Sequence, residues 1–211
     1  MHNGRRIPLP QDGFSEVYIA LGRRTGPHAI VTDDAVGPLE QRPRALRSRM
    51  EKKPLREIAL SEITAADGWE FLDYWASKKT GPGPPARRTL DPLIEKPHLV
   101  PCMYIYEVVD AGRDFRLRLV GTQVTALFGS DPTGRCMSEI WASSEIEANL
   151  QLMRKCMGTG EPVAAEGSYH WRGRAFIEWQ CVITPLRLDG PQVGQFLCFL
   201  SRLPFFKVLS C

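Results

Sequence analysis

The sequence predicts an α+β domain built on a five-stranded antiparallel sheet, with helices on one face and an N-terminal flanking helix. Three observations carry this prediction. A pair of alternating stretches at 103–109 and 115–122 is joined by a short turn. A long amphipathic stretch lies at 144–157, and three more alternating stretches follow at 162–169, 175–186 and 193–203. Strands joined by tight turns and interrupted by helices pack as an antiparallel sheet with a helical layer.

The chain of 211 residues is long enough for one sizeable core with an extension. We expect a basic, disordered extension at 1–56, a helical cap at 57–100, a core at 101–203 and an apolar C-terminal tail at 204–211. The extension holds 11 Lys and Arg against 6 Asp and Glu, whereas 57–211 holds 16 against 18. A slightly acidic core argues against nucleic-acid binding by the folded part. A basic arm that touches nucleic acid or anionic lipid stays open, as does translation from Met50.

Cysteine usage and apolar runs bear on location. The six cysteines, at 102, 136, 156, 181, 198 and 211, form no Cys-x-x-Cys pair and no zinc-type cluster. The N-terminus shows no secretory apolar segment, and no apolar run reaches the roughly 20 residues that span a bilayer. We therefore expect reduced, mostly buried thiols in a cytoplasmic protein, with no metal site and no membrane insertion.

Residues 64–76 have the pattern of an amphipathic helix. Thr64 is a candidate N-cap, and Asp67 stands three residues on. Trp69, Leu72 and Ala76 form an apolar stripe at positions i, i+3 and i+7. Such a helix can cover the sheet or pair with a second chain, and the sequence leaves both open.

A short helix is expected further on, where Asp91 precedes Pro92. An N-cap residue followed by proline at the first helical position is a common helix start. We expect this helix to run through Ile94 and Arg88 to form an ion pair with Asp91 or a nearby carboxylate.

The stretch 115–134 is expected to form a strand, a turn, a short helix and a loop. Phe115, Leu117 and Leu119 alternate with Arg116 and Arg118, the period of a half-buried strand. The side chain of Arg118 is therefore expected to point away from the core, as a structural or surface ion-pair donor.

The turn and the short helix depend on glycine. Gly121 lets the chain leave the strand, Thr122 is a candidate cap, and an apolar turn of helix ends at Phe128. Gly129 can take a positive φ and close that helix, and Gly134 bends the following loop.

The long helix is expected to begin at a capping box formed by Ser144 and Glu147 and to end at Gly158. Its apolar face carries Ile146, Leu150, Met153 and Met157.

The last two strands are expected to differ. In 175–186 one face, with Trp179 and Cys181, is core, and the other, with Gln180 and Thr184, is mostly wet. In 193–203 both faces are apolar, so a second layer must lie behind the sheet. The helix at Trp69, the tail at Phe205 and Phe206, or another subunit can supply it.

Several short motifs together resemble a known family. They are Arg118-Leu-Val-Gly-Thr122, Phe128-Gly129, Thr133-Gly134 and, upstream, Arg88-Thr-Leu-Asp91-Pro92. This order is similar to PAS_5, a proteobacterial branch of the PAS sensor domains, over roughly residues 69–203. The resemblance implies a PAS-like five-stranded sheet and gives structural roles to Arg88, Asp91, Pro92, Arg118, Gly121, Thr122, Gly129 and Gly134.

The PAS resemblance also implies a cavity between the sheet and the helices that follow the second strand. Its expected walls are Leu117, Leu119, Phe128, Trp141, Met153, Met157, Trp179, and Leu197 or Phe199. Apolar and aromatic walls suit a small apolar ligand. They equally suit a packed core that binds nothing.

The cofactor is left unknown, with haem and a LOV-type flavin disfavoured. Haem needs an axial ligand, most often His, and the long helix has none. The LOV motif Asn-Cys-Arg-Phe-Leu-Gln is reduced here to a lone Cys136. Common enzyme motifs are missing, and an enzyme of this shape would need a buried acid, for which Glu107 and Glu178 are the candidates.

We therefore expect a single-domain sensory or regulatory protein of bacterial signalling, without catalysis, that binds a small apolar ligand, a protein partner or both. A homodimer is expected, with the sheet face and the helix at Trp69 as the exchange surface. The alternative is a constitutive protein-interaction or nucleic-acid adaptor with a packed, ligand-free core.

Overall fold

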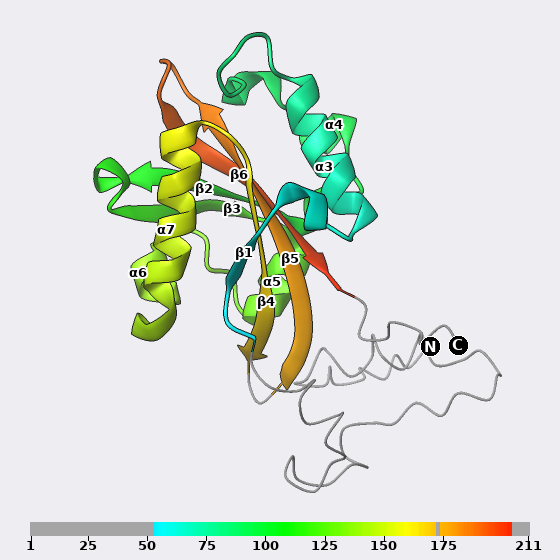
Figure 1. The fold of residues 1–211 in the computed structure, drawn as a ribbon, viewed down its shortest axis with the longest axis vertical. Helices are drawn as coiled ribbons and strands as arrows, with labels where there is room; N and C mark the ends of the chain where they lie inside the picture. The colour runs from blue at the N-terminus through cyan, green and yellow to red at the C-terminus, as the bar shows by residue number, and fades with distance from the viewer. Residues whose placement is uncertain (1–52, 172–173, 204–211) are drawn as a thin grey trace, which may run out of the picture. The chain divides into compact units, whose positions relative to one another are not determined.

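The computed structural model describes residues 53–171 and 174–203, which form a layered α+β unit around one antiparallel sheet (Figure 1). The sheet has six strands in the order β1-β4-β5-β6-β2-β3. Their bounds are β1 Arg56–Ile58, β2 Met103–Val109, β3 Asp114–Val120, β4 Val163–Trp171, β5 Arg174–Arg187 and β6 Val193–Arg202.

Helices lie on both faces of this sheet (Figure 1). One face carries α5 (Thr122–Phe128), α6 (Met137–Ile140) and α7 (Ser143–Thr159); the other carries α3 (Ala66–Ser77), with α4 (Pro92–Glu95) beside it. The 3-10 turns are η3 (Leu60–Glu62), η4 (Arg87–Thr89), η5 (Val100–Cys102) and η6 (Asp110–Gly112). In the described ranges no helix is long and apolar enough to cross a membrane.

The predicted α+β class is confirmed, and β1 adds one strand to the five expected. It pairs with β4 through Arg56 and Glu166, Glu57 and Ala165, and Ile58 and Ala164. Residues 53–56, which were expected to belong to a disordered extension, therefore lie along the sheet edge. A three-residue strand is too short to show a period of two, so the sequence does not reveal it.

The layer behind the sheet is supplied by α3, one of the three alternatives that the sequence left open. Phe71 is fully buried and stacks on Phe199, with ring centroids 5.3 Å apart. The indole of Trp75 donates to the carbonyl of Pro185 at 2.9 Å. This sheet face is thus covered within the chain.

The predicted stripe on this helix was mostly wrong. Leu72 is buried, but Trp69 is 40% exposed and Ala76 is exposed. The buried residues are Gly68, Phe71, Leu72, Tyr74 and Trp75. Both sets of residues have helical spacing, but Phe71, Tyr74 and Trp75 offer more apolar surface to the sheet than Trp69 and Ala76 do.

The second face of β5 is also drier than predicted. Gln180 and Thr184, expected on a wet face, are 3% and 0% exposed because α3 and the segment before it cover them. Gln180 accepts hydrogen bonds from the amide and hydroxyl of Thr64, at 2.9 and 3.1 Å. Thr64 therefore anchors the approach to α3, while Ala65 takes the N-cap position predicted for Thr64.

Both ends of α7 differ from the prediction. Ala142 is its N-cap, so Ser144 lies inside the first turn, and the side chain of Ser144 is outside the described set. Glu147 pairs forward with Arg154 at 3.4 Å. The helix ends at Thr159 with Gly160 in the left-handed region at φ 69°, two residues beyond the predicted stop at Gly158.

Candidate ligand cavity

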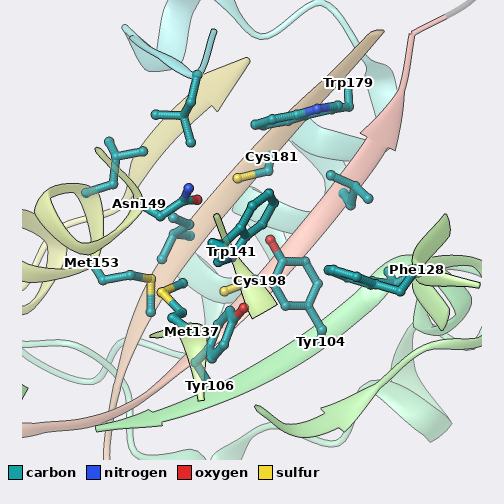
Figure 2. Close-up of a pocket in the computed structure, with 15 residues that line it drawn as sticks. Tyr104, Tyr106, Phe128, Met137, Trp141, Asn149, Met153, Trp179, Cys181 and Cys198 are labelled. Carbon is teal, nitrogen blue, oxygen red and sulfur yellow. The ribbon is translucent and has the colours of Figure 1, made fainter. Parts of the chain in front are cut away.

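A small apolar cavity lies between the sheet and the helices α5, α6 and α7 (Figure 2). Its volume is about 30 Å³. It is lined by Leu55, Tyr104, Tyr106, Val124, Phe128, Met137, Trp141, Asn149, Leu152, Met153, Trp179, Cys181, Ile183, Cys198 and Leu200. Three central strands and three helices thus meet around one space.

The sheet floor follows from strand alternation. Trp179, Cys181 and Ile183 occupy every second position of β5 and face the cavity. Cys198 of β6 pairs with Ile183 of β5 and faces the same way. Tyr104 of β2 pairs with Cys198 and extends this floor. The two cavity tyrosines, Tyr104 and Tyr106, pack edge to face with centroids 5.7 Å apart.

The helical wall brings aromatic and sulfur-containing side chains. Phe128 and Trp141 meet edge to face, with centroids 6.3 Å apart. Figure 2 shows the sulfur atoms of Met137, Met153 and Cys198 around the same space. Asn149 contributes a polar group, whose amide donates to the carbonyl of Glu145 at 3.0 Å.

Four predicted wall residues line the cavity: Phe128, Trp141, Met153 and Trp179. Two others belong to the same core without reaching the space. Leu117 is 1% exposed within that core. Met157 packs against the core and lies over Gly112, where an added Cβ would come within 2.5 Å of its methyl carbon.

Leu119 does not line the cavity, because of an irregularity in the β2–β3 pairing. Ile105 pairs with Leu119 and Tyr106 pairs with Leu117, so Arg118 is an extra residue in the bulged strand. The bulge puts Leu119 on the α3 face, where it is 43% exposed. The alternation from Leu117 to Leu119 predicted the opposite face.

Leu197 and Phe199 also lie on the α3 face, buried in the core that contains Phe71. The cavity side of β6 is formed by Cys198 and Leu200. Both faces of this strand are apolar, so alternation separates the two sets without indicating which one meets α7.

Sequence reasoning missed most of the cavity lining. Tyr104 and Tyr106 occupy alternating positions of β2, and that period could have found them once the strand was placed. Leu55 gives no such signal, since it belongs to the short segment ahead of β1. The acids considered for an enzyme, Glu107 and Glu178, are not among the lining residues. Glu107 pairs with Arg118 at 3.4 Å and Glu178 pairs with Lys53 at 2.7 Å.

The thiols around the cavity are held in the protonated form. Burial raises the pKa of Cys181 to about 11, and burial also raises the pKa of Cys198 well above its ordinary value. Cys156, just outside the lining, follows the same direction for the same reason. Neutral thiols are poor nucleophiles and poor metal ligands, so these residues act as apolar surface at neutral pH.

The residues present give no ready anchor for haem or for a flavinyl-thiol bond. Among the residues that the structure describes, no histidine lines the cavity. His98 is exposed and pairs with Glu70 at 3.0 Å. Cys136 is the N-cap of α6 and lies outside the lining. Within residues 53–171 and 174–203, no group of three His, Cys, Asp or Glu side chains is placed to hold a metal ion.

The family model PAS_5, described as a PAS domain, matches residues 63–201, more than half of the chain. The chain belongs to the PAS_5 family of PAS domains. This confirms the resemblance drawn from the sequence motifs. A comparison with curated proteins gives no match.

Solved structures similar to this PAS domain include two from Haloarcula marismortui. One is a domain of an HTR-like protein, 13% identical, covering 48% of this chain and 98% of that chain with a TM-score of 0.37. The second is the PAS domain of an HTR-like protein, which is 18% identical; the match covers 48% of this chain and 81% of that chain with a TM-score of 0.32. An RNA-binding light-oxygen-voltage receptor is 11% identical, and the match covers 79% of this chain and 47% of the receptor chain with a TM-score of 0.47.

The glycine motif residues of this PAS domain shape the path from β3 into α5. Gly121 is the N-cap of α5 and Thr122 its first residue, so the cap predicted at Thr122 lies one position earlier. An added Cβ at Gly121 would lie 2.4 Å from the carbonyl oxygens of Val100 and Pro101. Gly129 ends the helix with φ 73°, and Gly134 has φ 88°.

The remaining motif residues lie outside the cavity. Asp91 takes the N-cap position of α4, with Pro92 next, as expected. Arg88 is exposed, and in the described part of the chain it forms no ion pair with Asp91 or another carboxylate. Arg118, in the bulge, pairs with Glu107 at the surface. None of these residues is among those that line the cavity.

Proposed function

We propose that this PAS domain is a cytoplasmic sensory protein of bacterial signalling, without catalysis, whose cavity binds a small apolar ligand. The observation that carries the proposal is the apolar space between the sheet and α5 to α7, lined on several sides by buried side chains. Spaces of this kind, with a few polar groups among apolar walls, are where small molecules bind.

The size and charge of the cavity limit the ligand. A volume of about 30 Å³ corresponds to roughly two water molecules. A ligand of more than a few heavy atoms must therefore displace a wall side chain. The protonated thiols and aromatic rings favour an uncharged molecule, because a buried ion without a partner is costly.

Two truncations with matched burial test this proposal. Met153→Ala enlarges the existing cavity, whereas Leu197→Ala truncates an equally buried side chain on the α3 face, away from that cavity. Each change should lower the free energy of unfolding by about 2–5 kcal/mol. We expect M153A, and not L197A, to gain binding of benzene by native mass spectrometry and thermal shift. Equal binding by both variants would contradict the cavity assignment.

A protein partner is the second part of the proposal. The sheet face proposed for a homodimer is covered by α3 in this chain, so we place the contact on the outer surface of α3, where Trp69 is 40% exposed. Light scattering should show a dimer that Trp69→Glu weakens. A strict monomer at all concentrations would remove this component.

A constitutive adaptor with a packed core is the second candidate, favoured by the small volume of the cavity. Failure to detect any bound small molecule in the natively purified protein, together with no benzene binding by M153A, would support it. Salt-dependent DNA binding that disappears when residues 1–49 are deleted would support the nucleic-acid version.

A further inference from the structure

The segment 53–58, which contains β1 and is here called the edge strap, lies along the outer edge of β4 (Figure 1). The amide of Lys53 donates to the Ser168 hydroxyl at 2.7 Å, and the amide of Ser168 donates to the Lys53 carbonyl at 3.2 Å. Three residue pairs of the β1–β4 ladder follow. The strap is thus a short strand added to one side of the PAS sheet.

The strap touches both cores of the domain. Leu55 lines the cavity and packs against the core beneath α7. Ile58 is 4% exposed and belongs to the core beneath α3. The other residues of the strap are exposed. Two apolar side chains therefore hold the strap, and one of them is a wall of the cavity.

Surface ion pairs supply the rest of its attachment. Lys53 pairs with Glu178 at 2.7 Å and Arg56 pairs with Glu166 at 2.8 Å, while Glu57 pairs with Lys155 of α7. The side chains of Lys53 and Arg56 are 53% and 57% exposed. Ion pairs this exposed are weak and are screened by salt. These ion pairs therefore add little to the stability of the strap, which depends mainly on the short β1–β4 ladder and on Leu55 and Ile58.

Leu55 differs from the other cavity walls in what holds it. The β2, β5 and β6 residues belong to the centre of the sheet, and Leu152 and Met153 belong to the 17-residue helix α7. An occupant larger than the cavity must move one wall, and a half-buried wall at the sheet edge can move without breaking the pairing of the central strands. Leu55 is such a wall, and Phe128 and Trp141, on or next to the short helices α5 and α6, are the competing walls.

We infer that the edge strap reports cavity occupancy: a bound molecule displaces Leu55, and residues 53–58 leave the edge of β4. The backbone groups of β4 that pair with the strap are then free. This inference rests on the proposed function, because it concerns the same cavity. A ligand produces the change only through tighter binding to the strap-released state.

Hydrogen exchange of the full-length protein, read by mass spectrometry, tests the strap without an identified ligand. The first probe is a built-in occupant, Cys181→Phe, which adds a ring to the cavity floor. Amides of 53–58 and of their partners at 164–168 should exchange at least tenfold faster, while those of α5 and α6 keep their rates. Faster exchange confined to 122–141 would overturn the inference, because it would assign the movable wall to Phe128 and Trp141.

A background change makes this test specific for Leu55. Leu55→Ala already leaves space in the cavity for the added ring. In this background, Cys181→Phe should therefore leave the exchange rate of 53–58 as it is in L55A alone. An equal acceleration in both backgrounds would contradict the role of Leu55. Where Cys181→Phe does not fold, Cys181→Leu replaces it.

The ion pairs give a second test that leaves the cavity unchanged. Glu178→Gln, or raising NaCl from 0.05 to 0.5 M, should accelerate exchange of 53–58 severalfold relative to β2. Glu161→Gln is the matched control, since Glu161 pairs at the surface with Lys79 at 3.6 Å, away from the strap. No acceleration in either condition would show that the strap is not loosely held. Both tests can fail while M153A still binds benzene, so this inference and the proposed function fail separately.

Discussion

Gly121 stands where the chain turns from β3 into α5, and its surroundings leave no room for a side chain. Its φ of −67° suits any residue, so the requirement is steric: a Cβ would meet two backbone carbonyl oxygens at 2.4 Å. Gly121→Ala should lower the free energy of unfolding by about 1–3 kcal/mol, as overpacking does. Urea denaturation measures this.

Gly158 provides the control for this substitution. It lies within α7, and nothing comes within 4 Å of an added Cβ. Gly158→Ala should therefore stabilise the protein by up to about 1 kcal/mol, because alanine is the better helix residue. A loss of stability in G158A as large as that in G121A would mean that contacts at Gly121 are not the cause.

Glu95 joins α4 to α3 and should give the domain an acid-sensitive contact. Lys78 and then Tyr74 donate to its carboxylate and hold its pKa at about 2, below the ordinary value of 4.5. Since the pKa is lowered on folding, the carboxylate stabilises the fold above pH 4.5, and this contribution is lost as the pH falls towards 2.

Glu95→Gln should remove that dependence. We expect the difference in Tm between wild type and E95Q to be largest above about pH 5 and to close near pH 2. Tyr74→Phe removes one of the two donors to this carboxylate and keeps the ring. Its Tm should therefore depend on pH less than that of the wild type and more than that of E95Q. A constant difference across this pH range would contradict the role of the carboxylate.

Among the elements, α3 carries the clearest energetic prediction. Phe71→Ala removes a ring that is 0% exposed and stacks on Phe199. We expect it to lower the free energy of unfolding by about 3–5 kcal/mol. Trp69→Ala on the same helix should cost clearly less, since Trp69 is 40% exposed. Similar costs for both changes would mean that α3 does not cover the sheet in solution.

The sequence predicts elements better than it predicts faces. The bounds of β2 agree with the prediction, and Gly129 closes α5 as expected. The face of Leu119 could not be predicted because one extra residue, Arg118, reverses the alternation after it. Bulges have no sequence period of their own, and the position of Leu119 follows only from pairing with β2.

The candidate site was predictable to the extent that its residues lie in long elements. Met153 on α7 and Trp179 on β5 follow from helical and strand periods. Leu55 does not, because it reaches the cavity through an edge pairing with a strand more than 100 residues away. Cys198 was missed since both faces of β6 are apolar, and only the placement of α3 and α7 distinguishes them.

For the molecule as a whole, the buried thiols should report global unfolding. Cys156, Cys181 and Cys198 are at most 6% exposed, and burial raises the pKa of all three. At neutral pH we expect a thiol reagent to label Cys136 readily in the native protein and Cys102 more slowly, because burial also raises the pKa of Cys102. The three buried thiols should be labelled only at the rate of unfolding. Mass spectrometry of labelled peptides, with and without urea, measures the order. Native labelling of Cys181 as fast as that of Cys136 would show that the cavity opens readily.

The side chains of β5 alternate between the two cores of the domain. Cys181 and Ile183 face the cavity, while Val182 and Thr184, each one peptide bond away, face α3. The strand therefore separates the cavity from the core beneath α3. A shift of its backbone would move side chains in both cores at once. The cavity beneath α7 is therefore separated from α3 only by the sheet. A change in the cavity and a change in the packing of α3 are thus coupled through the backbone of β5.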